Sequence, residues 1–290
     1  MPHAGWQDFR FDGIGTGWEI STPDPLPPGL RSSLLDEVER YDATWSRFRE
    51  DSLVTLMSRA PGQYQLPPEA AGLAALYRQL YTLSGGAMTP LIGESLERLG
   101  YDPHYSLQPH GEAAPPPAWD AVLEWQGTSL RTTAPVMLDI GGAGKGQLVD
   151  LLAGQLRSHG VKDFFIDASG DLLNGGPEPV QVALEHPYDT TKAIGTVPLG
   201  SGALCASASN RRAWGDGLHH VLDGTTGAPV RTVVATWARA ETAMEADALA
   251  TALFLVPAED LDRNFRFSWL KVFSNGSAEY SAEFEGALFT

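Results

Sequence analysis

The stretch LDIGGAGKGQ (residues 138–147) places four glycines and one lysine directly after an acidic residue. A Walker-type phosphate loop needs a glycine five residues before the Gly-Lys pair and a Ser or Thr after the lysine. Asp139 and Gly146 occupy those two positions here. A dinucleotide-binding fingerprint needs a glycine at its sixth position, which is Gln147 when counted from Gly142. Both familiar phosphate-binding motifs are therefore excluded.

Two interpretations of this stretch remain open. The glycines can adopt positive φ and let the backbone approach a ligand closely. A helix that begins near Gly144 would direct its N-terminal N–H groups at an anion, and Lys145 would add a positive charge. Alternatively, the glycines form a tight turn between a strand and a helix, with Lys145 in solvent.

A second candidate lies in the stretch EADALATAL, which is typical of a helix. Asp247 and Thr251 are four residues apart, so the two side chains share one helix face. A carboxylate and a hydroxyl suit Mg²⁺, which binds few protein ligands and keeps water or phosphate oxygens. The alternative is that both residues belong to an ordinary polar helix face.

A third candidate is the stretch HHVLDGTTGAPV, which contains His219, His220 and Asp223. A histidine and a carboxylate three residues apart could act as a base and its orienting group, or line a nucleotide pocket. The sequence DGTTG is also typical of a hairpin turn, in which the histidine is structural. The histidines show no zinc-binding spacing, and a single cysteine cannot build a thiolate site.

Composition excludes several classes of protein. The chain has 290 residues, a net charge of −16 and one cysteine. So negative a charge argues against nucleic-acid binding, and a phosphate ligand would need a metal ion or backbone N–H groups. No basic and apolar leader is visible, and no apolar stretch approaches the roughly 20 residues that span a bilayer. We therefore expect a cytoplasmic protein with no membrane insertion.

The remaining pattern predicts an α+β fold. Helical spacing recurs in residues 30–49, 67–86, 144–159 and 241–256, and strand patterns lie between them. FDGIGTGWEIS (residues 11–21) is predicted as a strand. Because strands and helices do not alternate steadily, a doubly wound parallel sheet is disfavoured. We expect one domain over residues 1–290, with a core at about 11–256 and a proline-rich excursion at 102–118.

The order of these motifs resembles the ApbE family of FAD:protein FMN transferases, from about Phe11 to Val256. DIGGAGKG resembles the family's DLGGIAKG, HVLDGTTGAPV resembles HIIDPxTGxPV, and ADALATAL matches outright. Weaker similarities lie at residues 46–56 and 86–96. The resemblance implies a single ApbE-like, T-fold-like α+β domain with a mixed or antiparallel sheet and packed helices.

The family resemblance also implies an activity. Members use a divalent metal, usually Mg²⁺ and otherwise Mn²⁺, to split the pyrophosphate of FAD. They transfer FMN to a Thr or Ser hydroxyl of an acceptor flavoprotein and release AMP. By position, the metal ligands would be Asp247, Thr251 and the backbone carbonyl of Gly142. Asp247 could also accept the proton of the incoming hydroxyl.

Further contacts follow by position from the same resemblance. His220 would lie beside the pyrophosphate or the flavin as a second catalytic residue. The expected FAD contacts are Ile14, Ala87, Met88, Thr89, Asp139, Lys145, Ser207 and Leu222.

Several positions depart from the family pattern. Thr89 stands where the family usually has Asp, Leu91 where it has Thr, and Gly224 where it has Pro. Ala206 and Ser58 replace a usual Thr and Asn. These departures leave two alternatives open: FAD hydrolysis to FMN and AMP, or a flavin-binding protein without transfer activity.

Overall fold

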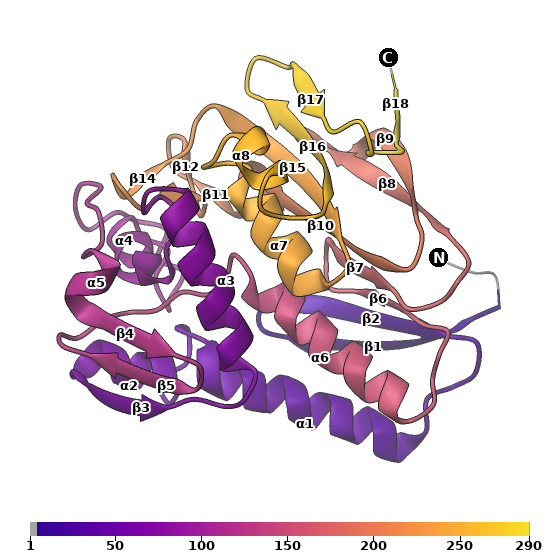
Figure 1. The fold of residues 1–290 in the computed structure, drawn as a ribbon, viewed down its shortest axis with the longest axis horizontal. Helices are drawn as coiled ribbons and strands as arrows, with labels where there is room; N and C mark the ends of the chain where they lie inside the picture. The colour runs from indigo at the N-terminus through magenta and orange to yellow at the C-terminus, as the bar shows by residue number, and fades with distance from the viewer. Residues whose placement is uncertain (1–4, 290) are drawn as a thin grey trace.

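The computed structural model describes residues 5–289 and has an eight-stranded antiparallel sheet at its centre (Figure 1). In spatial order its strands are β1 (Gln7–Gly13), β2 (Thr16–Thr22), β6 (Phe165–Asp167), β7 (Asp171–Asn174), β10 (Gly202–Ala208), β15 (Val233–Ala240), β16 (Ser268–Phe273) and β17 (Ala278–Tyr280). Every pairing in it is antiparallel. The α+β class with an antiparallel sheet is confirmed.

Residues 11–21 do not form the single predicted strand. They belong to the hairpin of β1 and β2, in which Gly13 pairs with Thr16. The turn residues Ile14 and Gly15 both have positive φ, 44° and 77°, as in the tight turns that join twisted strands. The prediction was wrong because apolar and small residues alternate across the turn, and isoleucine rarely adopts this conformation.

Four longer helices pack on or beside the sheet: α1 (Pro28–Trp45), α3 (Ala70–Leu83), α6 (Gly144–Ser158) and α7 (Ala243–Ala252). α3, α6 and α7 lie within regions predicted to be helical, and α1 begins two residues before its predicted region. In α1 the buried residues recur at helical spacing, and Leu34, Val38 and Tyr41 face the core. Figure 1 shows α6 and α7 side by side across one face of the sheet.

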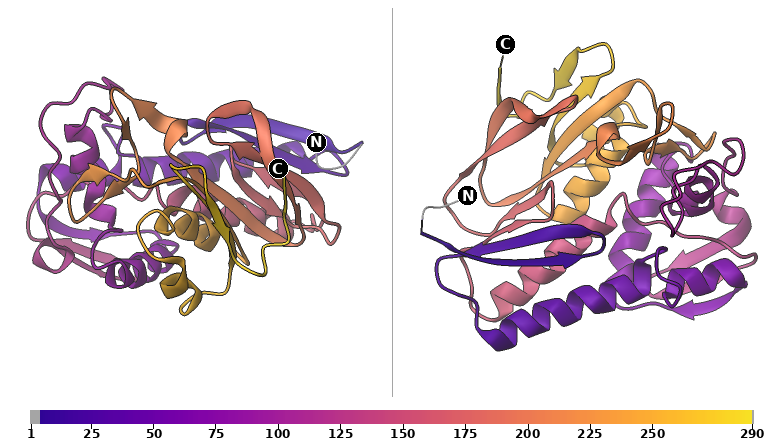
Figure 2. Two further views of the ribbon diagram at one scale, coloured as in Figure 1. Left: turned by 90° about the horizontal axis from the view of Figure 1, so that it is seen from above. Right: turned by 180° about the vertical axis from the view of Figure 1, so that it is seen from behind.

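The two faces of the sheet carry different cores. In β10, Ala203 and Cys205 pack under the helices, while Leu204 packs on the opposite face, because successive strand residues point to opposite faces. That opposite face is partly covered by a smaller sheet of β8 (Val180–His186), β9 (Asp189–Leu199) and β18 (Ala287–Leu288). The view from above in Figure 2 shows these layers. Small residues under α7 let this helix approach the sheet closely.

The remaining elements surround one end of the helical layer. They are α2 (Leu53–Arg59), β3 (Gly62–Gln65), η1 (Pro90–Ile92), α4 (Gly93–Arg98), α5 (Trp119–Val122), β4 (Leu123–Gln126), β5 (Ser129–Thr132), η2 (Ser209–Arg212), β11 (Ala213–Trp214), β12 (Leu218–His219), β13 (Leu222–Asp223), β14 (Ala228–Pro229) and α8 (Ala258–Asp262). Residues 102–118, the proline-rich stretch, carry no helix or strand and are mostly exposed.

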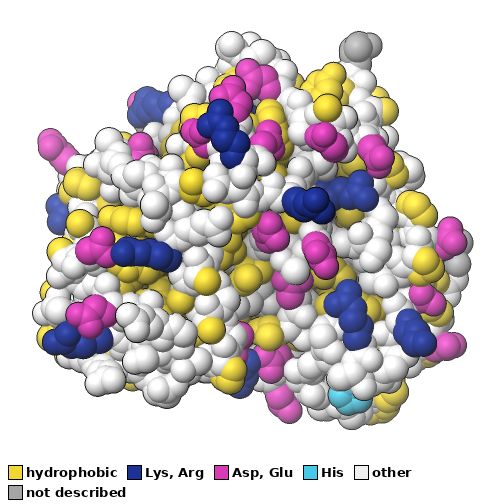
Figure 3. Space-filling model, viewed as in Figure 1, with side chains coloured by type: hydrophobic (Ala, Val, Ile, Leu, Met, Phe, Trp, Pro, Cys, Tyr) yellow, Lys and Arg dark blue, Asp and Glu magenta, His cyan; other side chains and the backbone are white. Residues whose placement is uncertain are grey.

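The surface carries charges of both signs. On the face drawn in Figure 3, Lys and Arg side chains are scattered among acidic ones. Within residues 5–289, no helix is both long and apolar enough to cross a lipid bilayer.

Candidate functional site

A cavity of about 790 Å³ opens where the helical layer meets the loops that follow β10 and η2. Its wall draws on segments from residue 14 to residue 255. It includes every residue that the family resemblance assigned to catalysis, metal binding or FAD contact, namely Ile14, Ala87, Met88, Thr89, Asp139, Gly142, Lys145, Ser207, His220, Leu222, Asp247 and Thr251. Residues far apart in the chain thus meet at one site of a size suited to a small ligand.

The glycines before and within the first turn of α6 serve helix packing. A Cβ on Gly146 would lie 2.1 Å from the carbonyl oxygen of Ala243, and one on Gly144 would lie 2.7 Å from Cδ1 of Ile140. None of the four glycines in residues 138–147 has positive φ, so that prediction was wrong. Gly146 is needed because α6 and α7 touch backbone to backbone.

This close contact brings α7 side chains to the start of α6. The Gly146 N–H donates to Oδ2 of Asp247 at 2.9 Å, so the carboxylate caps the N-terminus of α6. One turn along α7, the hydroxyl of Thr251 lies 3.2 Å from that of Ser207. A Cβ on Gly142 would lie 3.2 Å from Cγ2 of Thr251. The three expected metal ligands are therefore neighbours.

Lys145 makes an ion pair inside the protein. Its Nζ lies 2.6 Å from Oδ2 of Asp171 and donates to the Ala168 carbonyl at 2.9 Å. Burial acts to lower the pKa of Lys145, but the charges of Asp171 and Asp247 and the hydrogen bond to Asp171 together raise it above its usual value. The alternative of a solvated lysine is thus excluded. Sequence reasoning missed Asp171, although a carboxylate directly before two leucines in β7 was a usable signal.

Asp247 lies in a strongly acidic environment. Burial, followed by the charge of Asp171, raises the pKa of Asp247, and Lys145 and the Gly146 N–H oppose that effect. A buried carboxylate without its own cation is costly. This environment therefore favours binding of a proton or a metal ion at Asp247.

Asp139 is held on both sides by the protein. Its Oδ2 accepts from Nε of Arg47 at 2.7 Å, and its Oδ1 accepts from the Gly141 N–H at 2.7 Å. Burial would raise the pKa of Asp139, but Arg47 lowers it below its usual value. Asp139 therefore links the loop after α1 to the glycine turn. Arg47 was not predicted, and no local pattern pairs it with a residue more than ninety positions away.

Part of the cavity wall carries backbone strain. Of the non-glycine residues with positive φ within 5–289, three line the cavity: Ile14 (44°), Tyr105 (50°) and Ser169 (54°). Such conformations cost free energy and cluster at binding sites. Tyr105 belongs to the excursion, so this segment also forms part of the cavity wall.

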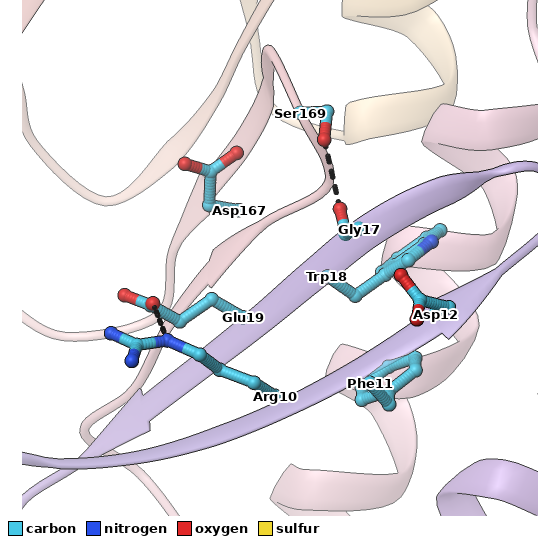
Figure 4. Close-up of a pocket in the computed structure, with 8 residues that line it drawn as sticks. All are labelled: Arg10, Phe11, Asp12, Gly17, Trp18, Glu19, Asp167 and Ser169. Atoms are coloured by element: carbon cyan, nitrogen blue, oxygen red, sulfur yellow. Dashed lines mark hydrogen bonds and ion pairs between the residues drawn. The ribbon is translucent and has the colours of Figure 1, made fainter.

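A shallow hollow of about 430 Å³ adjoins this strained wall. Figure 4 shows Ser169 at its edge, where its hydroxyl donates to the carbonyl of Gly17 at 2.9 Å. This bond ties the turn between β6 and β7 to the β1–β2 hairpin. This hydrogen bond therefore helps to position the hairpin turn that contains Ile14. The hollow itself is lined by the ion pair of Arg10 and Glu19.

The two histidines have different environments. His219 is buried and its Nε2 lies 2.7 Å from the Val230 carbonyl, so it is structural. His220 lines the cavity, and its Nδ1 has no partner within residues 5–289. Burial, followed by the charge of Arg212, lowers the pKa of His220 to about 3. The His220 ring is therefore neutral near pH 7.

Asp223 does not orient either histidine. Its Oδ1 accepts from the backbone N–H of Thr225 at 2.8 Å and from that residue's hydroxyl at 2.6 Å. These bonds close the turn between β13 and β14. The interpretation of Asp223 as an orienting group is therefore wrong and the hairpin turn is observed, while His220 from the same stretch lines the cavity.

Two departures from the family pattern lie against each other. The Gly224 N–H donates to the Ala87 carbonyl at 2.8 Å, which a proline could not do. A Cβ on Gly224 would lie 2.7 Å from Cγ2 of Thr89 and 2.6 Å from the Gly86 carbonyl. The changes at positions 89 and 224 therefore belong to one altered contact in the cavity wall.

The donor atoms at Asp247 fit a hard cation. Within residues 5–289 no cluster of three or more His, Cys, Asp or Glu side chains could hold a metal. One carboxylate, one hydroxyl and one backbone carbonyl are instead the few oxygen ligands that Mg²⁺ takes when phosphate and water complete its shell. Zinc would require nitrogen or sulfur ligands that this site lacks.

Comparisons with known proteins agree with this picture. A model of the ApbE family matches residues 14–267. The FAD:protein FMN transferase of Rhodobacter capsulatus is 30% identical over 273 residues, covering 86% of this chain and 51% of the relative. That of Vibrio cholerae is 29% identical over 147 residues, or 47% of this chain and 44% of the relative. The matched part thus spans about half of each relative.

The fold has been seen before in a solved structure. The crystal structure of the ApbE protein from Thermotoga maritima superposes with a TM-score of 0.83 at 24% identity. The match covers 97% of this chain and 99% of that one.

Proposed function

This chain belongs to the ApbE family, and on that premise we propose that it is a metal-dependent FAD:protein FMN transferase. It cleaves the pyrophosphate of FAD, attaches FMN through a phosphoester to a Thr or Ser of an acceptor flavoprotein, and releases AMP. One observation carries the proposal. Three separate motifs between residues 139 and 253 converge on one cavity, where Asp247 makes no ion pair with any cation of residues 5–289.

The cation of this reaction would be Mg²⁺ or Mn²⁺, held by Asp247, Thr251 and the Gly142 carbonyl. When bound, the ion supplies positive charge against the phosphate oxygens of FAD. The protein's part is to hold these ligands in place. The Gly146 N–H orients the Asp247 carboxylate, and the Lys145–Asp171 ion pair fixes the first turn of α6 beneath it.

Transfer exchanges one P–O bond for another. The acceptor hydroxyl oxygen bonds to the phosphorus of the FMN half, and the bond from that phosphorus to the bridging oxygen breaks. The electron pair stays with AMP. Because burial and Asp171 raise its pKa, Asp247 can take the hydroxyl proton. A neutral His220 serves as a hydrogen-bonding group beside the substrate and not as the base.

Incubation with FAD and Mg²⁺, with and without an acceptor flavoprotein, tests the proposal. AMP is measured by chromatography and FMN attachment by the mass of the acceptor. We expect AMP and a flavinylated acceptor only when both proteins are present, and neither in EDTA. An acceptor with its Thr or Ser changed to Ala is the matched control and should remain unmodified.

The same assay separates the alternatives. AMP formed equally well without an acceptor would make the protein a FAD pyrophosphatase. FAD that is retained without any AMP would make it a flavin-binding protein, and the departures at Thr89, Leu91 and Ala206 would then have abolished transfer. Either result overturns the transferase proposal.

A further inference from the structure

The cavity wall carries cations, and nearly all of them are neutralised. Each of four pairs joins a cation to a carboxylate within 4 Å: Arg47–Asp139 (2.7 Å), Arg49–Asp42 (3.1 Å), Lys145–Asp171 (2.6 Å) and Arg211–Glu185 (2.9 Å). Arg212 also lines the cavity, and no carboxylate of residues 5–289 lies within ion-pair distance of it. Its guanidinium is thus a cation with no counter-ion among residues 5–289.

Arg212 is well placed to act inside the cavity. It ends η2, which connects β10, the strand of Ser207, to β11 and onward to His220. Its guanidinium carbon lies 5.9 Å from the ring centre of Tyr101, another cavity residue. Its positive charge also contributes to the lowered pKa of Asp139 and opposes the rise in the pKa of Asp247. The charge of Arg212 therefore acts on Asp139 beside the glycine turn and on Asp247 in α7.

The charged side chains of the cavity wall that make no ion pair have opposite signs. The carboxylates of Asp42, Asp139 and Asp171 are all neutralised by ion pairs, whereas Asp247 makes none. One unpaired anion and one unpaired cation thus face the cavity. A divalent cation at Asp247 and a diphosphate with one negative charge per phosphate would preserve this balance. Bond cleavage then adds negative charge on the departing phosphate, and a guanidinium can bind it through two N–H groups.

We propose that Arg212 binds the diphosphate of FAD from the η2 side of the cavity and stabilises the negative charge on the departing AMP. This assignment rests on the proposed function. In the transfer step, the broken P–O bond leaves its electron pair on an AMP oxygen, and that oxygen is the partner of the guanidinium. No proton moves to or from Arg212, because a guanidinium stays charged.

The test compares neighbouring arginines of the same helical turn. Arg212→Gln should lower kcat for AMP release by about 100-fold, the usual loss when one charge-stabilising donor is removed. Arg211→Gln is the matched control, because Glu185 already neutralises that side chain, and it should lose less than about threefold. In Arg212→Ala, added guanidinium chloride below denaturing concentrations should restore part of the activity, which a purely structural role would not allow.

Binding measurements keep this test separate from the proposed function. FAD with Mg²⁺ should bind Arg212→Gln about tenfold more weakly than the wild type, whereas riboflavin, which has no phosphate, should bind both equally. This comparison holds even if the wild type cleaves no FAD, a result that would overturn only the proposed function. Equal FAD affinity for both proteins, or equal losses of affinity in Arg211→Gln and Arg212→Gln, would overturn the assignment of Arg212.

Discussion

Two sides of the same cavity are built in different ways. We call Gly142, Lys145, Gly146, Asp247 and Thr251 the floor. Its side chains and backbone are mutually bonded or in contact, through the Asp247–Gly146 hydrogen bond, the ion pair from Lys145 to β7 and the tight seam between α6 and α7. Folding alone therefore arranges the floor.

The facing side, the rim, consists of Ile14, Tyr105, Arg212 and His220. Two of these residues have strained positive φ, His220 Nδ1 has no partner, and Arg212 has no counter-ion within residues 5–289. Buried polar groups in native proteins are normally bonded. The difference teaches that the floor is held in place by its own contacts and lacks only a cation at Asp247, whereas the rim has unpaired groups left for a ligand.

The largest effect is expected at the floor, from Asp247→Asn. Loss of the charged ligand should reduce AMP release at saturating Mg²⁺ by at least about 100-fold. The matched control is Asp260→Asn, which changes an exposed ion pair on α8 and should leave activity unchanged. Full activity in Asp247→Asn would show that the Asp247 carboxylate is not needed for the reaction.

The second prediction concerns the packing of the floor. Gly146→Ala would place a Cβ against the Ala243 backbone and should lower the free energy of unfolding by about 2–3 kcal/mol. Gly154→Ala lies on the same helix with open space around it and should raise stability by roughly 0.5–1 kcal/mol. Urea titrations measure both. A Gly146→Ala protein as stable as the wild type would contradict the tight seam.

A smaller loss is expected where the loop of Gly224 meets Ala87. Gly224→Pro, which restores the residue usual in the family, should be about 1–2 kcal/mol less stable than Gly224→Ala because it also removes the N–H donor to Ala87. Gly224→Ala retains that N–H and isolates the steric contribution. Thermal unfolding of both variants measures the steric loss and the hydrogen-bond loss separately. If Gly224→Pro were more stable than the wild type, the glycine at this position would not be needed for the contact with Ala87 and Thr89.

The smallest effect belongs to His220 and depends on pH. The unfolded chain protonates this ring below its ordinary pKa of 6.5, but the folded protein does so only near 3. Folding stability should therefore fall as the pH drops from about 6.5 towards 3. In His220→Gln this fall should be smaller, by about 1 kcal/mol at about pH 5.8. Identical pH profiles in urea titrations would mean that His220 titrates alike in both states.

The floor was largely predictable from the sequence and the rim was not. Four-residue spacing placed Asp247 and Thr251 on one face of a helix that the structure contains. In contrast, the partnership of Arg47 and Asp139 depends on how α1 crosses the glycine turn, which no local pattern encodes. The turn at Ile14 and the return of Tyr105 to the cavity also depend on tertiary contacts that outweigh local backbone preference.

The most direct test of the account is to locate the metal. Crystals soaked with Mn²⁺ and FAD would reveal the ion by its anomalous scattering. We predict one peak bonded to Asp247, Thr251 and the Gly142 carbonyl, at about the 2.1 Å typical of a small hard cation. The account would be contradicted by a peak elsewhere, such as in the hollow beside Asp167, or by FAD bound in the cavity with no ion at Asp247.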